Sequence, residues 1–518
     1  MIDRQTGSIT AAFLAVLIAA VSCAFGQGPP KQLREELYHE SLRPQFHFTA
    51  RYWNDYRLEP KEHQEGWIND VNGLVYLDGE YHFFAQRWWS CWLHAASKDL
   101  VHWKELPPAF GKDDKFGGTQ SGGAVVDYDN TSGLAIGKTP VMVAFWASTD
   151  NLRQCISYSN DRGRTWVKYE KNPVLVHPER DPKVFWYAPE KKWIMLLYGP
   201  PEHSYLLFSS KNLLDWTKIG EPIPDMYECP DMFELPLDGD PAHTKWVIVN
   251  GDGSYVVGTF NGTAFHAETE KMRGDYGRNF YATMTWNGMP QRDGRRIQAA
   301  WMRGGSYPEM PFNQQITFPA ELTLRTLPEG IRLCRNPIRE IEKIYDRSIK
   351  LVDKRLDPRE SLLSGVTGEL FDIRIEIDTS KTNCKQIVLN ARGNEVKYFV
   401  NEQVVESCGV RQALKPRSQR VSLRILVDRM SIETYGNEGE VSITNVARAQ
   451  ALKPALALRA IGGEAHISSV SVHTLRSIWP VHVAKLQQPK LRAPSGGSRS
   501  DPVVALAGRL AGNPAPRW

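Results

Sequence analysis

Three acidic side chains lie directly before apolar runs of the chain, in settings that resemble one another. They are Asp70 in Trp67-Ile-Asn-Asp-Val-Asn-Gly-Leu, Asp181 in Arg180-Asp-Pro-Lys-Val-Phe and Glu228 in Tyr227-Glu-Cys-Pro-Asp-Met-Phe. Convergent carboxylates suit glycoside hydrolysis, in which one acts as a nucleophile or base and another donates a proton to the leaving oxygen. Turn capping by each acid alone, or calcium binding by all three, is the alternative.

The residues beside these acids favour sugar chemistry. Trp67 and Arg180 flank them, and no run of further acids surrounds them. An aromatic face packs well on the C–H surface of a sugar, and an arginine can anchor a carboxylate. We therefore interpret the three acids as candidate catalytic groups, provided that the fold brings them together.

The region that must position the acids, residues 41–335, reads as all-β. Short apolar runs alternate with Gly, Pro, Asn and Asp, and no long helical periodicity appears. A Ser-x-Asp/Asn turn followed by Trp recurs, ending at Trp103, Trp166 and Trp216, which are 63 and 50 positions apart. This spacing is typical of propeller blades and predicts about five of them. Ordinary turn and core residues of a β-sandwich are the alternative.

The spacing of the acids agrees with such a propeller. Asp70, Asp181 and Glu228 are separated by 111 and 47 residues, about two blades and one blade. Innermost propeller strands surround one central channel, so side chains at their ends converge although they are distant in sequence. We therefore expect the three carboxylates to share one end of the channel.

A second β-rich region follows a charged stretch. Residues 336–358 are rich in Arg, Glu and Lys and are interpreted as a linker with room for a short helix. Residues 359–480 contain eight short runs that alternate apolar with polar residues, which predicts a β-sandwich. Residues 484–518 are rich in Pro, Gly, Ser and Arg, and we expect this basic tail to be mostly disordered.

Charge and hydropathy limit the partners and the compartment. The 518 residues include 63 Lys and Arg against 59 Asp and Glu, a balance that does not favour a nucleic-acid binder. Residues 1–26 have the basic start, apolar run and small residues of a signal peptide, so we expect a secreted or periplasmic protein. Lipoprotein anchoring through Cys23 is the alternative. No other apolar stretch is long enough for stable membrane insertion.

The motifs around the acids, taken together, resemble glycoside hydrolase family 32, the invertase, inulinase and levanase family. Trp67-Ile-Asn-Asp-Val-Asn-Gly is similar to the family's Trp-Met-Asn-Asp-Pro-Asn-Gly. The resemblance extends through Gly79-Glu-Tyr-His-Phe-Phe-Ala-Gln, Ser121-Gly-Gly-Ala-Val-Val-Asp, Arg180-Asp-Pro-Lys and Tyr227-Glu-Cys-Pro-Asp to Leu426-Val-Asp-Arg-Met-Ser-Ile-Glu-Thr-Tyr. It covers residues 41–479, and the ordered set of motifs is specific.

The resemblance implies a five-bladed β-propeller with a C-terminal β-sandwich and retaining hydrolysis of β-fructofuranosides such as levan, inulin, fructo-oligosaccharides or sucrose. By the same matching, Asp70 is the nucleophile, Glu228 the acid/base and Asp181 the stabiliser of the transition state. A retaining pair predicts carboxyl groups of Asp70 and Glu228 about 5 to 5.5 Å apart. The residues matched to substrate binding are Asn69, Gln86, Trp92, Ser121 and Arg180. The family implies no metal and no organic cofactor.

Several positions depart from the family pattern. Val71 replaces Pro, Leu93 replaces Gly, and Asn279 replaces Asp, while Gln120 and Glu179 stand where aromatic residues are usual. The segment Arg87-Trp-Trp-Ser-Cys91 is shorter than the family's loop, and Trp88 and Trp89 could form a platform for an adjoining sugar. We expect these changes to place a bulkier or more polar wall around the pocket, so sucrose activity cannot be assumed.

Four functions are compatible with this sequence. The leading hypothesis is an exported, exo-acting β-fructosidase, tested by the release of fructose from sucrose, inulin and levan. A fructosyltransferase would instead form longer oligosaccharides at high sucrose, and a non-catalytic fructan-binding propeller would bind without hydrolysis. A glycosidase of arabinofuranosides also uses a three-acid propeller, but the motif contexts disfavour it. The sequence leaves linkage preference, endo or exo action and oligomeric state open.

Overall fold

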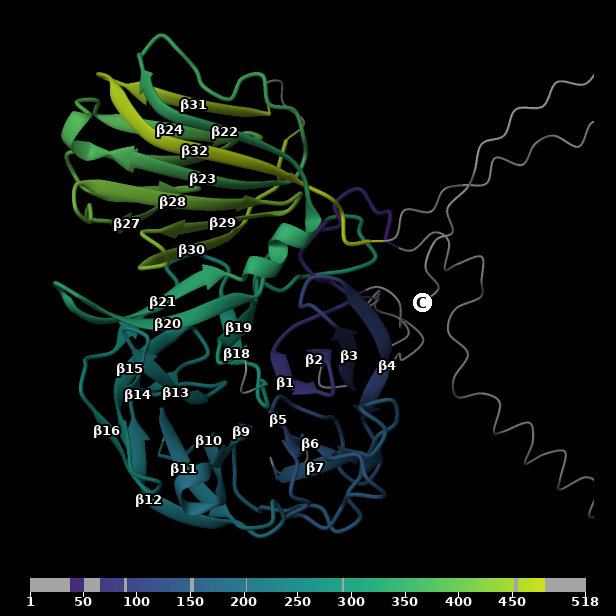
Figure 1. The fold of residues 1–518 in the computed structure, drawn as a ribbon. Helices are drawn as coiled ribbons and strands as arrows, with labels where there is room; N and C mark the ends of the chain where they lie inside the picture. Colours follow the sequence, from purple (N-terminus) through teal and green to yellow (C-terminus); the bar gives the residue numbers. More distant parts are fainter. Residues whose placement is uncertain are drawn as a thin grey trace, which may run out of the picture. The chain divides into compact units, whose positions relative to one another are not determined.

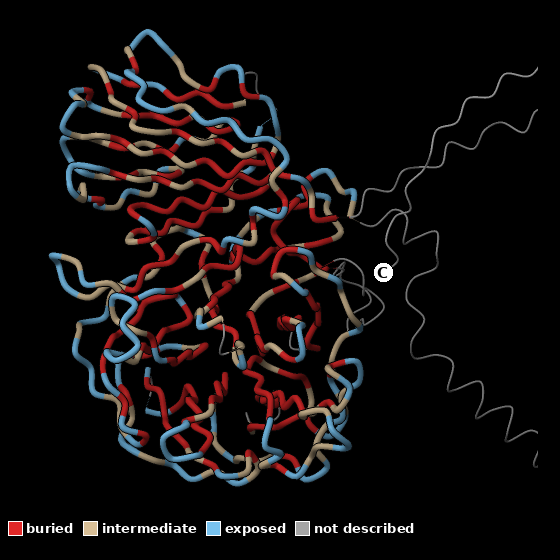
Figure 2. Tube along the Cα trace, in the orientation of Figure 1, coloured by how far each residue is buried: buried red, intermediate tan, exposed pale blue. Residues whose placement is uncertain are grey.

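The computed structural model describes residues 38–50, 66–87, 91–149, 153–201, 203–290, 293–450 and 455–479. These residues form strands joined by turns and short 3₁₀ helices, so the expected all-β class is confirmed (Figure 1). Buried positions follow the strands, and exposed positions gather in the connecting loops (Figure 2). The predicted signal peptide at 1–26 with Cys23, the tail at 484–518, and Trp88 and Trp89 lie outside the described residues.

The first β-rich region is a five-bladed propeller. Blade one contains β1 (Val71–Leu77), β2 (Glu80–Arg87), β3 (Cys91–Ser97) and β4 (Trp103–Gly111). Blade two contains β5 (Ala124–Asp127), β6 (Val141–Ala147), β7 (Gln154–Ser159) and β8 (Val167–Lys168). Blade three contains β9 (Arg180–Tyr187), β10 (Lys192–Gly199), β11 (Ser204–Ser210) and β12 (Thr217–Pro224), with the 3₁₀ helix η1 (Ala188–Glu190) after β9.

The last two blades form one continuous sheet. Blade four contains β13 (Asp231–Leu237), β14 (Asp240–Val249) and β15 (Ser254–Phe260), with β16 (Phe265–Ala267) and β17 (Met272–Arg273) both paired to β15. Blade five contains β18 (Tyr281–Thr285), β19 (Arg296–Trp301), β20 (Ala320–Leu327) and β21 (Gly330–Pro337). A single parallel pair, Leu237 with Leu324, joins β13 to β20.

The repeated Ser-x-Asp/Asn turns connect the third and fourth strands of the first three blades, as their pattern predicts. The side chains of Asp99, Asp161 and Asn212 each accept hydrogen bonds from backbone N–H groups further along the turn, at 2.8 to 3.1 Å. These bonds satisfy donors that the strands leave free. The Trp that follows each turn then packs at the start of the outer strand, so the repeat marks the blades.

The innermost strands β1, β5, β9, β13 and β18 surround the channel. Blade five meets blade one through a parallel bridge between Val75 and Asn287, in which Tyr76 N–H donates to the Asn287 carbonyl at 2.9 Å. The Asn287 side chain also donates to the carbonyls of Ala124 and Val184, at 2.9 and 3.0 Å. Through its backbone carbonyl and its side-chain amide, Asn287 therefore ties β1, β5 and β9 together and fixes where their ends lie.

The second β-rich region is a sandwich of two antiparallel sheets. The larger sheet has the order β22 (Tyr345–Leu356), β32 (Ala465–Leu475), β23 (Phe371–Asp378), β28 (Arg420–Val427), β29 (Ser431–Gly436) and β30 (Val441–Val446). The smaller has β27 (Val410–Ala413), β26 (Val404–Ser407), β25 (Asn394–Phe399), β24 (Gln386–Ala391) and β31 (Leu456–Ile461). The 3₁₀ helix η3 (Thr379–Lys381) follows β23, and apolar side chains from both sheets form the core.

The linker predicted at residues 336–358 is wrong over most of its length. Only the 3₁₀ helix η2 (Arg339–Ile344) connects the two regions, and β22 then pairs with β32 from Tyr345 to Leu356. This strand lies at the edge of its sheet and is exposed along most of its length. Edge strands often carry charged residues, which discourage pairing with other chains. The same charges conceal the strand from a search for apolar alternation.

The N-terminal segment before β1 contacts the sandwich through a buried charge cluster. The Asp428 carboxylate accepts backbone N–H groups of Gln45, Phe46 and His47, at 2.8 to 3.2 Å, and lies 2.8 Å from Nδ1 of His47. His47 Nε2 is 3.4 Å from Glu433, and all three side chains are fully buried. The segment therefore contacts the propeller and the sandwich.

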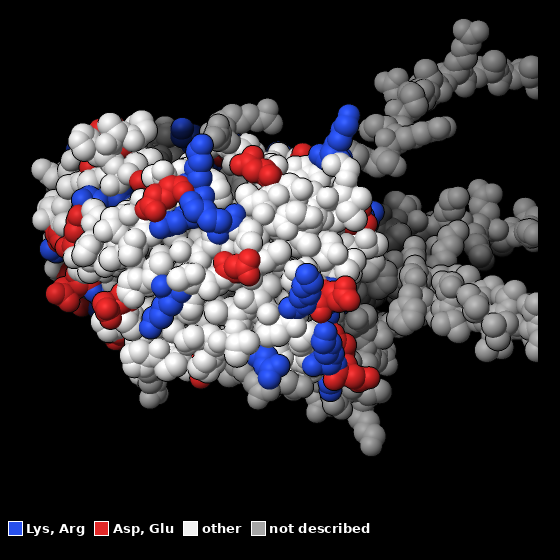
Figure 3. Space-filling view, turned by 90° about the horizontal axis from the view of Figure 1, so that it is seen from below, with Lys and Arg blue, Asp and Glu red and all other residues white. Residues whose placement is uncertain are grey.

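On the face that Figure 3 shows, Lys and Arg are interspersed with Asp and Glu and form no broad basic patch. Among the described residues, no helix has the length and apolar character to cross a bilayer.

Candidate active site

The three predicted catalytic acids lie at the same ends of innermost strands. Asp70 immediately precedes β1, Asp181 is the second residue of β9, and Glu228 lies three residues before β13. Asp181 is buried, with 5% of its surface exposed, whereas Asp70 and Glu228 are partly exposed. The propeller therefore brings together carboxylates that are 111 and 47 residues apart, as the sequence spacing predicts.

Two of these acids occupy left-handed backbone conformations. The φ angle is 65° at Asp181, 41° at Glu228 and 43° at Cys229. Such angles are costly for residues with a side chain and persist where neighbours hold them. The Glu228 carbonyl accepts the Tyr205 hydroxyl at 2.7 Å and the Gly251 N–H at 3.1 Å, and Cys229 N–H donates to Asp181 at 2.9 Å. The turn at Glu228 thereby orients two catalytic candidates together.

Asp70 stands at the end of a chain of polar side chains. The Ser121 hydroxyl donates to Asp70 Oδ2 at 2.6 Å, and Gln86 Nε2 donates to Ser121 at 2.9 Å. Asn69 donates to Gln86 Oε1 at 2.6 Å, and Trp67 Nε1 donates to Asn69 at 3.1 Å. Oδ1 of Asp70 accepts no hydrogen bond from any residue that the structure describes. One carboxylate oxygen is therefore held and the other is available.

Glu228 lies between two donors. Arg180 donates from one guanidinium nitrogen to Oε1 of Glu228, and the Tyr281 hydroxyl donates to Oε2. The other nitrogen of Arg180 binds Glu179. Arg303 stacks on the Tyr281 ring, 4.7 Å from its centroid, which brings a second cation to this end of the channel. Arg180 and Arg303 both lower the pKa of Asp70 and so offset part of the negative charge.

Burial and neighbouring carboxylates raise the pKa values of Asp181 and Asp70. Burial and the negative charge of Asp70 raise the pKa of Asp181 to about 7, against the donated Cys229 N–H and the charge of Arg180. Burial also raises the pKa of Asp70; the Ser121 hydrogen bond opposes this shift, and the charge of Glu228 adds to it. Like charges around one site disfavour full ionisation, so the cluster retains a proton toward neutral pH.

A buried ion pair lies beneath the acids. Lys183 Nζ is 3.1 Å from Asp231 and donates to the Thr285 carbonyl at 3.1 Å, while Asp231 accepts the Thr285 N–H at 2.6 Å. Both charged side chains are almost fully buried. Lys183 follows Asp181 by two residues and Asp231 follows Glu228 by three, so the pair connects β9, β13 and β18 under the site.

The residues predicted to bind substrate differ in how accessible they are. Arg180 contacts Glu228, and Asn69 is partly exposed in the polar chain that leads to Asp70. Gln86 and Ser121 are 2% and 3% exposed, so their roles depend on the chain of hydrogen bonds. Trp92 is fully buried among apolar side chains and donates Nε1 to the Gln120 carbonyl at 2.9 Å. Trp92 therefore packs behind the residues that line the site. Substrate binding by the predicted residues stays a prediction.

The expected change in the pocket wall is wrong for two of the five departures. Val71 and Leu93 are buried in an apolar cluster, 2% and 6% exposed, because their positions on β1 and β3 direct them into the core. The other three are polar and remain near the site. Glu179 binds Arg180, and Asn279 donates to the Arg303 carbonyl at 2.7 Å and accepts the Val446 N–H at 2.8 Å. The Gln120 carbonyl accepts Trp92.

Sequence reasoning missed the residues that support the acids. Tyr281, Arg303, Tyr205 and Lys183 were not singled out, although Lys183 lies inside the quoted motif Arg180-Asp-Pro-Lys. The sequence marks them only by a polar side chain near the start of an apolar strand. Such side chains are common elsewhere in the chain. In the described residues, no group of three His, Cys, Asp or Glu side chains has an arrangement that could hold a metal ion.

The chain is similar to known proteins over both β-rich regions. Residues 61–337 match the glycosyl hydrolases family 32 N-terminal domain, and residues 340–474 match the family 32 C-terminal domain. A levanase of Bacillus subtilis (strain 168) is 36% identical over 500 residues, covering 85% of this chain and 72% of that protein. The extracellular exo-inulinase inuE of Aspergillus niger is 31% identical over 535 residues, covering 84% and 96%.

Solved structures agree with these matches. The crystal structure of exo-inulinase from Aspergillus awamori has a TM-score of 0.73 and 26% identity, covering 85% of this chain and 100% of that one. A fructofuranosidase from Schwanniomyces occidentalis, complexed with fructose, has a TM-score of 0.72 and 25% identity, covering 84% and 98%. The predicted resemblance is confirmed, and the chain belongs to glycosyl hydrolase family 32.

Proposed function

We propose that the protein is an exo-acting β-fructosidase that releases fructose from fructan or fructo-oligosaccharide with retention of configuration. The observation that carries this proposal is the meeting of Asp70, Asp181 and Glu228 at one end of the channel. The levanase and exo-inulinase relatives support the substrate class. Metal and organic cofactors have no part in the proposed chemistry.

In the first step, Asp70 attacks the anomeric carbon of fructose as the bond to the leaving sugar breaks. The Ser121 hydroxyl holds Oδ2 of Asp70, so Oδ1 is the oxygen in a position to form the fructosyl ester. Glu228 transfers its proton to the leaving oxygen, which departs as a hydroxyl group. Substrate must therefore reach Glu228 by displacing a donor, and Arg180 and Tyr281 are the groups that it displaces.

In the second step, Glu228 takes a proton from water, and the water oxygen attacks the same carbon. The ester bond to Asp70 breaks, which frees fructose and restores the carboxylate. Asp181 holds fructose hydroxyls while positive charge develops on the ring. Its raised pKa, about 7, means that Asp181 can donate as well as accept a hydrogen bond near neutral pH.

The test is a panel of sucrose, inulin, levan and levan oligosaccharides, with released fructose measured and products separated by chromatography. We expect fructose as the first product, and NMR of fresh product should show the β-furanose before mutarotation. Glu228→Gln should lose on the order of 10²-fold or more in kcat. The matched control is Glu438→Gln at an exposed turn, which should retain full activity. No fructose from any substrate would reject the function, and longer oligosaccharides at high sucrose would indicate transfer instead.

Export is part of the proposal and rests on the apolar run in residues 1–26. The mature protein should begin after Gly26. N-terminal sequencing of protein recovered from the medium or periplasm tests this, and retention of the first 26 residues in that protein would reject a cleaved signal. Recovery of a lipid-modified protein that begins at Cys23 would favour the anchored form.

A further inference from the structure

A cavity of about 450 Å³ lies at the ends of the innermost strands opposite the carboxylates. The acids precede or begin β1 and β9, whereas Tyr76 and Trp186 lie near the far ends of those strands. A strand of seven residues spans roughly 23 Å, so the cavity is distinct from the proposed active site. Its volume is within the range of small-molecule sites.

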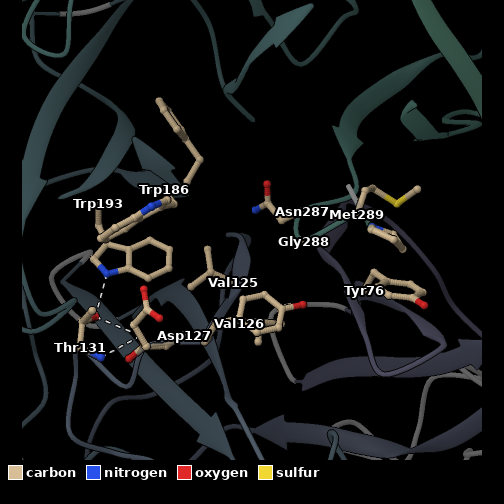
Figure 4. Close-up of a pocket in the computed structure, with 14 residues that line it drawn as sticks. Tyr76, Val125, Val126, Asp127, Thr131, Trp186, Trp193, Asn287, Gly288 and Met289 are labelled. Atoms are coloured by element: carbon tan, nitrogen blue, oxygen red, sulfur yellow. Dashed lines mark hydrogen bonds between the residues drawn. The ribbon is translucent and has the colours of Figure 1, made fainter. Parts of the chain in front are cut away.

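The walls of this distal pocket are aromatic. Figure 4 shows Trp186 and Trp193 on one side and Tyr76 with Met289 on the other. Trp193 is 5% exposed and donates Nε1 to Thr131 at 2.9 Å, and its ring meets Trp186 edge to face at 4.9 Å. Trp186 keeps part of its surface exposed. The buried tryptophan thus holds the accessible one in place, and a platform fixed in advance loses little entropy on binding.

The polar groups of the pocket divide into used and available ones. The Asp127 carboxylate accepts four hydrogen bonds from Thr131 and Ser132, at 2.7 to 3.1 Å. In contrast, the Trp186 indole N–H, the Tyr128 hydroxyl and the Asp129 carboxylate make no hydrogen bond to a described residue. Tyr128 is 56% exposed, and its hydroxyl lies beside Gly288 across the pocket. These three groups therefore offer a ligand hydrogen-bond donors and an acceptor that no described residue of the protein occupies.

The charge of the lining selects the ligand class. None of the described residues that line the pocket is Lys, Arg or His, so an anion would find no counter-charge there. A cation would need a desolvated carboxylate, but Asp127 is saturated and Asp129 is exposed to water. A neutral ligand with a C–H face and hydroxyl groups fits best, because rings pack on the face and the rim bonds the hydroxyls.

We propose that this distal pocket binds one or two sugar units of a fructan chain, as a second carbohydrate site of the enzyme. The choice of fructan rests on the proposed function, whereas the choice of a neutral sugar rests on the pocket. A chain held there raises the local concentration of its ends near the active site. The benefit therefore applies to long substrates and not to short ones.

The direct test is ¹⁹F NMR of full-length Glu228→Gln protein labelled with 5-fluorotryptophan, titrated with levan or inulin oligosaccharides. The Trp186 resonance is assigned by its absence in a Trp186→Phe variant. We expect this resonance to shift saturably, and Tyr128→Ala with Asp129→Ala to weaken the shift by fivefold or more. Both substituted residues are exposed, so folding should survive. A shift with tetramethylammonium only, or with neither probe, would overturn the proposal.

The kinetic test uses otherwise wild-type protein. Tyr128→Ala should raise KM for long levan about threefold or more while leaving kcat and KM for the shortest cleaved oligosaccharide unchanged. Val176→Ala, a change at another exposed position outside the pocket, is the control. Equal KM for long levan in both variants would overturn the second site while the β-fructosidase remained intact. Absence of all turnover would instead reject the proposed function, and the Trp186 titration would stand on its own.

Discussion

Two acidic clusters in this protein have opposite electrostatics. At the active site, burial and neighbouring carboxylates raise the pKa values of Asp70 and Asp181. At the junction with the sandwich, burial would raise the pKa values of Asp428 and Glu433, but hydrogen bonds and charge from His47 outweigh it and lower them. The same residue types therefore hold a proton more tightly in one place and less tightly in the other.

The difference lies in the donors that each cluster receives. Asp428 accepts four backbone N–H groups and lies against His47, whose pKa burial would lower but whose bonds to Asp428 and Glu433 raise to about 9. Asp70 receives one hydroxyl and Asp181 one backbone N–H. A cluster whose carboxylates receive many donors stabilises the fold, whereas one left short of donors keeps reactive oxygens for a substrate.

The largest expected effect comes from Asp70→Asn. This change removes the attacking oxygen and should reduce kcat on the order of 10⁴-fold. Because it also removes a charge that repels Asp181 and Glu228, the free energy of unfolding should stay the same or rise. Kinetics with urea unfolding of the same preparation measure both. Near-normal turnover, or a clear decrease in the free energy of unfolding, would contradict the proposed difference between the active-site cluster and the junction cluster.

The second expected effect is on stability at the junction. Asp428→Asn leaves His47 with one acidic partner instead of two. It also replaces the carboxylate that accepts the backbone N–H groups with a weaker, neutral acceptor. Together these losses should lower the unfolding free energy by about 3 to 5 kcal/mol. Turnover per folded molecule should not change. Asp346→Asn on the exposed strand β22 is the control and should be neutral. If the two variants unfold at the same denaturant concentration, the junction cluster does not stabilise the fold.

The third effect is a change in pH dependence. The folded pKa of Asp181 lies above its ordinary value of 3.8, so its contribution favours folding below pH 3.8 and is lost as pH rises through about 7. Asp181→Asn should therefore flatten the unfolding free energy between pH 4 and 7 relative to wild type. Denaturant titrations at a series of pH values would detect this, and parallel curves would contradict the raised pKa.

The smallest effect is expected from Ser121→Ala. The hydroxyl lowers the pKa of Asp70, so its loss should move the acidic limb of the kcat/KM profile to higher pH by about one unit. Activity at the acidic end would fall about tenfold, with less change near neutral pH. Ser132→Ala, in a turn outside the active site, serves as the comparison. An unmoved limb would assign it to a group other than Asp70.

The sequence predicted the structure best where a local pattern of residue types has one structural meaning. Turns with Ser and Asp, strand spacing and the three acids followed local rules, and these rules located the blades and the ends of β1, β9 and β13. Val71 and Leu93 were misjudged because similarity to a motif does not say which way a strand directs a side chain. The His47 cluster escaped notice because its members are 381 and 386 residues apart and no local pattern joins them.

Strand β22 has a consequence for dissecting the protein. The sandwich sheet pairs this early strand with β32, the last one along the described chain. A fragment that starts at residue 359 would contain every apolar-patterned strand of the sandwich, and β32 would still pair with β23 but would have no neighbour on its other edge. Such a fragment should self-associate through that bare edge, and one that starts at Arg339 should stay monodisperse.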